Sequence, residues 1–177
     1  SSRGVGMVTM EGHEIEAAAL VYATGYELAD GVPSSGHRRT STWAFATRPQ
    51  LARLRAHQDI VWEASTPYLY MRSTADGRLL VGGEDAPLDD AVARDALLPG
   101  KVRPLRRKLR EVRPDVDTEP EYAWAGTFGE SSDGLPSIGL VPGAPNCYAV
   151  LGYGGNGITF GKIAAENEGV DRQDAPA

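Results

Sequence analysis

Short runs of hydrophobic residues, bounded by glycine, proline or aspartate, recur along most of the sequence. Runs of this length with turn residues between them are typical of short strands joined by hairpins. Strands are therefore expected at residues 5–9, 14–19, 18–23, 42–47, 60–63, 68–72, 78–82, 121–128 and 146–151. The Asp76-Gly77 pair lies between two of these runs and is a strong hairpin signal.

Two other segments show helical spacing. Residues 87–98 and 101–113 are expected to form helices that Pro99-Gly100 separates. The apolar residues of the second helix recur on one face, at Val102, Leu105, Leu109 and Val112. The basic residues of the run 103–110 then form the solvated face, and an anion-binding patch is the alternative.

About eight strands and three helices result, and most neighbouring strands are joined by hairpins. This arrangement predicts an α+β or α/β fold, with a mostly antiparallel sheet and flanking helices. Residues 29–40, rich in Gly, Pro and Ser, are expected to be a loop, and the polar residues 170–177 a frayed tail.

Composition narrows the function classes. The chain has 177 residues, 41% of them hydrophobic, which is ordinary for a globular protein. A net charge of −6 argues against nucleic acid as a partner. No apolar run is long enough to span a bilayer and no signal peptide is visible, so we expect a cytoplasmic protein. The first residue, Ser1, is not methionine, so a fragment and a natural short subunit are both open.

The residues that could bind metals lack the necessary spacing. Cys147, the single cysteine, lies in an apolar run and is expected to be a buried small hydrophobe. The histidines share no metal spacing and are expected at the surface; they are His13, His37 and His57. The acidic pairs Glu84-Asp85 and Asp89-Asp90 are interpreted as charges at a strand end and a helix N-terminus.

The stretch 152–157 holds four glycines in six residues. An apolar run, 147–151, leads into it, and the small-residue segment 163–166 follows, so the order is strand, turn and helix. Such a turn lets backbone approach a ligand closely, and the helix start points N–H groups at it. A cofactor loop and a turn that only packs the strand on the helix both fit this pattern.

Five segments stand in a specific order along the chain. They are VYATGYE at 21–27, PYLYMR at 67–72, DGRLLVGGED at 76–85, WAGTF at 124–128 with DGLP at 133–136, and GYGGNGIT at 152–159. In this order they resemble the FAD-dependent D-amino acid oxidase superfamily, and within it the glycine/D-amino acid oxidase-like (deaminating) enzymes.

The resemblance covers only the C-terminal half of that family. The family opens with a strand, a Gly-x-Gly-x-x-Gly turn and a helix that cradle the FAD pyrophosphate, and we expect this segment to be absent. The implied domains are 1–28, the closing hairpin and strand of a Rossmann-like FAD-binding domain; 29–130, the substrate-binding domain; 131–169, the return to the FAD-binding domain; and 170–177, the tail. A partner chain could supply the missing half, and a non-catalytic fragment or accessory subunit that does not bind FAD alone is the alternative.

The resemblance implies non-covalent FAD, because covalently flavinylated relatives carry a cysteine near 124–128 and this chain has none there. The implied cofactor-binding residues are Ala23, Thr24, Gly25, Gly134, Gly152, Gly154, Gly155, Asn156, Gly157, Ile158 and Thr159. In the family the glycine loop lies along the pyrimidine end of the flavin, where N–H groups and a helix N-terminus stabilise negative charge. A plain turn is the alternative for Ala23-Thr24-Gly25.

Alternation places Tyr68, Tyr70 and Arg72 on one face of a strand. The family's equivalent sheet covers the flavin and touches substrate, so Arg72 either holds a substrate carboxylate or is a surface arginine. Many relatives carry an arginine near Phe128; its absence shifts that role to Arg72 or favours a non-acidic amine. The implied function is oxidation of the C–N bond of an amino acid or small amine by hydride transfer to flavin, with no catalytic acid or base identified.

Overall fold

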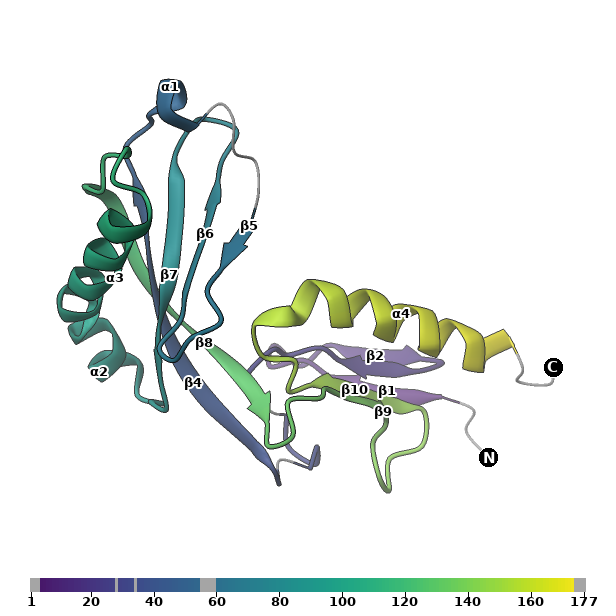
Figure 1. The fold of residues 1–177 in the computed structure, drawn as a ribbon. Coiled ribbons are helices and arrows are strands. Elements are labelled where there is room, and N and C mark those ends of the chain that lie inside the picture. Colours follow the sequence, from purple (N-terminus) through teal and green to yellow (C-terminus); the bar gives the residue numbers. More distant parts are fainter. Residues whose placement is uncertain (1–3, 28, 34, 55–59, 174–177) are drawn as a thin grey trace. The chain divides into compact units, whose positions relative to one another are not determined.

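The computed structural model describes residues 4–27, 29–33, 35–54 and 60–173, with side chains as far as Glu166. The chain forms two compact units, which Figure 1 shows. Residues 1–39 and 128–177 make the first unit, and residues 40–127 make the second. Strands β4 (His37–Thr47) and β8 (Pro120–Ser131) each contain one of the points at which the chain passes between units.

The second unit is built on a five-stranded sheet with the order β5-β6-β7-β4-β8. The additional strands are β5 (Ile60–Trp62), β6 (Leu69–Ser73) and β7 (Leu79–Ala86). The pairs β5–β6, β6–β7 and β4–β7 are antiparallel, as the hairpin pattern predicts. Gly77 closes the β6–β7 hairpin with a φ of 81°, a conformation that glycine adopts without strain.

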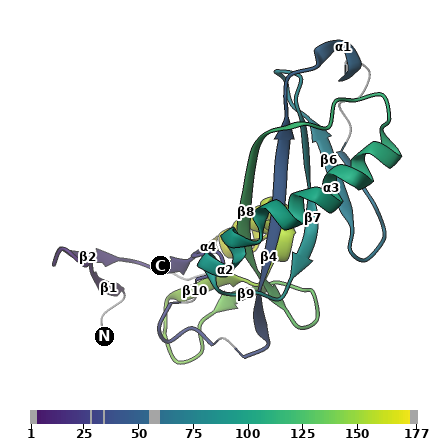
Figure 2. The ribbon, with the colours of Figure 1, turned by 90° about the vertical axis from the view of Figure 1, so that its left-hand side faces the viewer.

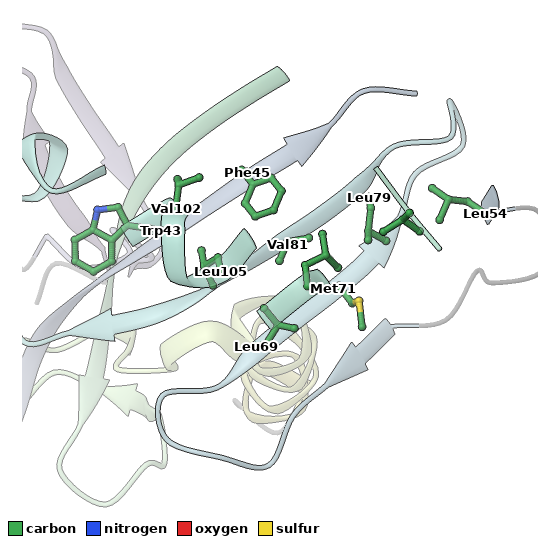
Figure 3. Close-up of a cluster of buried hydrophobic side chains, with 11 residues drawn as sticks. Trp43, Phe45, Leu54, Leu69, Met71, Leu79, Val81, Val102 and Leu105 are labelled. Carbon is green, nitrogen blue, oxygen red and sulfur yellow. The ribbon is translucent and has the colours of Figure 1, made fainter. Parts of the chain in front are cut away.

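One face of this sheet is covered by α3 (Leu98–Val112), which crosses the strands in Figure 2. The short helices α1 (Leu51–Leu54) and α2 (Ala91–Ala96) belong to the same unit. Figure 3 shows the core cluster between helix and sheet. Its buried members are Trp43, Phe45, Leu54, Leu69, Met71, Leu79, Val81, Val102, Leu105, Leu109 and Val116.

The helix boundaries differ from those expected. Because α3 begins at Leu98, Pro99-Gly100 lies in its first turn instead of breaking the helix. Proline is tolerated there, since the first N–H groups of a helix have no partner within it. Helix α2 covers only Ala91–Ala96, and Asp90 caps it by accepting the N–H of Ala93 at 2.8 Å. Val112 is 50% exposed and lies outside the core.

The basic residues of α3 are not simply solvated, which corrects the expectation for this face. Arg106 donates from Nε to the Thr118 carbonyl at 3.1 Å, and Arg110 donates from Nε to the Thr118 hydroxyl at 3.1 Å. Lys108 donates to the Pro67 carbonyl at 2.6 Å. These side chains therefore tie α3 to the segments beside it.

The first unit contains the β1–β2 hairpin (Val5–Val8 and Glu14–Ala17) and a three-stranded sheet. That sheet has the order β3-β10-β9, formed by Leu20–Tyr22, Cys147–Leu151 and Ser137–Leu140. Strand β3 runs parallel to β10, and β9 runs antiparallel to it. A 3-10 turn, η1 (Gly154–Asn156), and helix α4 (Gly157–Gln173) follow β10. Cys147 is 7% exposed in the core of this unit, as predicted.

Each of the nine strand ranges expected from the sequence contains a strand, and with β9 and α1 the described residues form ten strands and four α-helices. Strand β9 and the single-turn helix α1 were not predicted, because both are too short to show a clear period. Residues 37–40 belong to β4 and not to the expected loop. Among the described residues, no helix is long and apolar enough to cross a membrane.

Candidate functional site

Two of the segments predicted to bind cofactor leave the same edge of the first unit's sheet. Strands β3 and β10 are parallel neighbours, with Tyr22 opposite Ala149. Residues 23–25 and 152–157 follow their carboxyl ends, which is where ligands bind in parallel sheets. A methyl group on Gly25 would lie 3.8 Å from the hydroxyl of Tyr153, so the two segments adjoin.

The glycine loop, which we define as residues 152–157, begins at a position that admits only glycine. Gly152 is buried and has a φ of 71°. A methyl group there would lie 2.6 Å from Cδ2 of His37 and 3.3 Å from the backbone nitrogen of Ser131. Gly154 also has a positive φ, 55°. The loop therefore owes its shape to residues without side chains.

Helix α4 starts at Gly157, directly after the glycine loop. The first N–H groups of a helix have no partner within it and carry partial positive charge. The first turn of α4 contains no acidic side chain that would offset this charge. Gly155, Asn156 and Thr159 are exposed, and Ile158 is 95% exposed. This end of α4 can therefore meet an anionic or hydrogen-bond-accepting ligand.

Gly134 lies in a turn that is linked to the glycine loop. Asp133 shapes the turn, because its Oδ1 accepts the N–H of Leu135 at 3.0 Å and the hydroxyl of Ser131 at 2.9 Å. These hydrogen bonds, the backbone bond first, hold the pKa of Asp133 below its ordinary value. The backbone nitrogen of Ser131 in turn donates to the carbonyl of Gly152 at 3.3 Å.

The predicted substrate residues lie in the second unit, on the sheet face opposite α3. Their neighbours on β6, Leu69 and Met71, are buried in the core, so alternation places Tyr68, Tyr70 and Arg72 on the other face, as predicted. Arg72 is exposed, whereas both tyrosines are half-buried. Burial, followed by the charge of Asp85, raises the pKa of Tyr70.

Trp62 extends this face and was not predicted. It lies opposite Tyr70 in the β5–β6 pair, and its ring centroid is 5.8 Å from that of Tyr68. The rings of Tyr68 and Tyr70 are 6.2 Å apart, and Tyr68 donates to Asp85 at 2.5 Å. The order of β5 and β6 in the sheet, which the sequence alone does not specify, makes these rings neighbours. We call Trp62, Tyr68 and Tyr70 the aromatic face.

His37 is not the surface residue that was expected. It is half-buried against the glycine loop, and its Nδ1 is buried with no hydrogen-bond partner among the described residues. Its Nε2 lies 3.4 Å from the hydroxyl of Ser137. His13 is exposed, as expected, and His57 lies outside the described residues. In the part of the chain that the structure describes, no cluster of His, Cys, Asp or Glu could hold a metal ion.

The glycine loop contains a Gly-x-Gly-x-x-Gly spacing, although this motif was expected to be absent from the chain. Gly152, Gly154 and Gly157 have the Gly-x-Gly-x-x-Gly spacing, and they stand between a strand and a helix, where this motif occurs. In a dinucleotide-binding unit the helix leads to a second parallel strand. Within the described residues no strand follows α4, so the spacing alone does not make this a pyrophosphate cradle.

Comparisons with known proteins find related oxidoreductases. The chain is 34% identical over 102 residues to the probable oxidoreductase OrdL of Rhizobium meliloti (strain 1021), a match that covers 55% of this chain and 22% of the relative. The probable oxidoreductase OrdL of Haemophilus influenzae is 29% identical over 102 residues, covering 55% of this chain and 21% of that protein. The chain thus matches about a fifth of these relatives.

Solved structures share the fold. Glycine oxidase from Geobacillus kaustophilus superposes with a TM-score of 0.71 at 22% identity, covering 93% of this chain and 43% of that one. L-proline dehydrogenase from P. horikoshii gives a TM-score of 0.71 at 19% identity, with coverage of 91% and 45%. The model of the FAD-dependent oxidoreductase family matches residues 1–167. The chain therefore belongs to the FAD-dependent oxidoreductases of the D-amino acid oxidase superfamily, as its motifs predicted, and FAD is the cofactor of that family.

Proposed function

We propose that the protein oxidises the C–N bond of an amino acid or a small amine, with non-covalently bound FAD as the acceptor of a hydride. The observation that carries this proposal is the meeting of residues 23–25 and the glycine loop at the carboxyl ends of two parallel strands. The names of the structural relatives, glycine oxidase and L-proline dehydrogenase, favour an amino acid as substrate.

The residues of the first unit fit a flavin ring. Gly155 is exposed, and no atom lies within 4 Å of the position its Cβ would take, so a flat ligand can approach backbone there. The N–H groups of Gly157, Ile158 and Thr159 begin α4 and would hold the acceptor atoms of the ring. Bound FAD would supply the redox chemistry as the acceptor of a hydride from the substrate carbon. The N–H groups and the dipole of α4 would stabilise negative charge on a ring held there.

The aromatic face and Arg72 are proposed to receive the substrate. An exposed guanidinium can pair with a carboxylate through two parallel hydrogen bonds. The neighbouring rings exclude water from the alkyl part of an amine. Near Phe128, where many relatives place a carboxylate-binding arginine, the hydroxyl of Thr127 accepts instead from Arg94 at 2.8 Å. Arg72 therefore takes the carboxylate role in this proposal.

The test begins with the visible spectrum of the full-length protein, in which we expect bound flavin. Acid precipitation should release that flavin into the supernatant, since no covalent link is proposed. Under anaerobic conditions the flavin absorbance should bleach with the substrate in a panel of amino acids and amines. Purified protein that carries no flavin, or no bleaching with any amine, would contradict the proposal.

A second candidate function is a chain that lacks activity by itself. The observation that favours this candidate is that the chain matches only 43% of the glycine oxidase chain. In this case residues 1–177 bind FAD weakly or not at all, and a fluorescence titration with FAD measures the affinity directly. Binding at micromolar concentration or tighter would exclude this candidate.

A further inference from the structure

We propose that His37 is a positioning residue for the flavin. Its ring packs against Gly152 and fixes the path by which the glycine loop leaves β10. In this way it sets the affinity for FAD and the flavin reduction potential. This inference rests on the proposed function, because it requires that the glycine loop contacts FAD.

The contact between His37 and Gly152 is the tightest point of the glycine loop. Both Cδ2 and Nε2 of the imidazole lie where a side chain at Gly152 would be, at 2.6 and 2.7 Å from a Cβ built there. A histidine ring therefore occupies the side-chain position of the residue that follows Leu151. A side chain at Gly152 would clash with the ring, and the φ of 71° is one that residues with side chains rarely adopt.

The residues on both sides of His37 contact the end of β8 and the residue that follows it, Gly36 through its backbone and Arg38 through its side chain. The carbonyl of Gly36 accepts the N–H of Ser132 at 2.7 Å. Arg38 forms an ion pair with Glu130 at 3.0 Å, and Glu130 pairs with Tyr153 in an isolated β-bridge. The start of β4, the end of β8 and the glycine loop are therefore connected around His37. A displacement of this ring would reach the loop through Gly152.

Packing, more than hydrogen bonding, places the imidazole. Its Nδ1 has no partner among the described residues, and its Nε2 is 3.4 Å from Ser137, at the long end of hydrogen-bond distances. The ring also lines a hollow of about 410 Å³ together with Leu151 and Pro136.

The first experiment compares ring removal with ring replacement in the full-length flavoprotein. The variants are His37→Ala and His37→Phe, and the matched control is His13→Ala, which removes an exposed histidine of the same unit. The readouts are the FAD dissociation constant, from reconstitution of apoprotein, and the flavin reduction potential. We expect His37→Ala to raise the dissociation constant about tenfold or more and to shift the potential, and His37→Phe to stay within about threefold of the wild type.

The second experiment is a double-mutant cycle with Gly152→Ala. Alone, this substitution should weaken FAD binding, because its methyl group meets the imidazole. In the His37→Ala background the steric part of that loss should disappear, so the loss from the added methyl group should be smaller than in the wild type. Thermal midpoints of the four apoproteins show that each variant folds.

The outcomes separate the two proposals. Wild-type protein without flavin refutes both the proposed function and the positioning role of His37. If the wild type contains flavin but His37→Ala leaves the FAD dissociation constant and the flavin reduction potential unchanged, only the positioning role of His37 is refuted. The positioning role is also refuted if His37→Phe binds FAD as weakly as His37→Ala does. It is refuted as well if the losses of FAD affinity caused by His37→Ala and Gly152→Ala are additive in the double variant.

Discussion

Gly82→Ala tests whether substrate binding depends on the position of the Tyr70 ring on the aromatic face. In the sheet Gly82 lies opposite Tyr70, and the phenol ring covers it. A Cβ at Gly82 would lie 2.2 Å from Cζ and Oη of that ring and 2.7 Å from Cε1. Ordinary van der Waals contact begins at 3.4 Å, so the ring must move by about 1.2 Å (3.4 minus 2.2).

The stability cost of this shift should be small. A side chain pushed off its rotamer costs about 0.5–1.5 kcal/mol. Replacing glycine by alanine in a strand returns about 0.5–1 kcal/mol, because the unfolded chain loses freedom. The two effects nearly cancel, so the free energy of unfolding should change by less than about 1 kcal/mol. Since 1 kcal/mol corresponds to about 2–4 °C, the thermal midpoint should change by no more than this amount.

Substrate binding should respond much more strongly than stability. If the ring contacts substrate, Gly82→Ala should raise KM about tenfold, close to the effect of Tyr70→Ala, which corresponds to about 1.4 kcal/mol. In the double variant the ring is absent, so the alanine should add nothing further. Gly126→Ala is the matched control, because no atom lies within 4 Å of a Cβ built there. An unchanged KM in Gly82→Ala, with a folded protein, would refute this role for Tyr70.

Three further predictions concern the core, the substrate and pH. Leu105→Ala should lower the free energy of unfolding by about 2–5 kcal/mol in a denaturant titration, because Leu105 is fully buried, whereas the exposed Val92→Ala should change it by less than about 0.5 kcal/mol. Arg72→Leu should raise KM for amino acids about tenfold or more while sparing neutral amines, and Arg72→Lys should restore it only in part; equal effects on both substrates would contradict carboxylate binding. The N–H of Leu135 holds the pKa of Asp133 low, so its contribution to stability is present above the ordinary carboxyl pKa of about 3.9 and is lost as the pH falls through the folded value. Thermal midpoints between pH 6 and 2 should therefore fall further in the wild type than in Asp133→Asn, and parallel curves would show that the turn does not depend on the charge.

Features encoded by neighbouring residues were predictable from the sequence. The Asp76-Gly77 hairpin formed because the dipeptide itself selects the turn, and Gly77 shows the positive φ that this requires. The buried stripe of α3 followed from the spacing of Val102, Leu105 and Leu109. The glycine loop was visible for the same reason, since its conformation depends on its own composition.

Features that depend on which strands become neighbours were not predictable. Trp62 lies beside Tyr68 and Tyr70 only because β5 pairs with β6, and no local sequence pattern predicts that pairing. His37 contacts Gly152 across 115 positions of sequence, so its spacing gave no reason to assign it anything but a surface position. Charges on α3 found partners in segments such as Thr118 for the same reason.

The cofactor and the substrate assignments therefore rest on different kinds of information. In the proposed site the glycine loop acts through backbone, so glycines at 152, 154 and 157 are nearly all that it requires, and a family with diverse substrates can keep them. The proposed substrate-binding residues, Tyr70 and Arg72, would act through their side chains, and one substitution there could change the substrate without changing the fold. Membership of the family consequently supports FAD more strongly than it supports any particular amine. A protein that bound flavin but ignored every amino acid would overturn the role of Arg72 and leave the glycine loop's role intact.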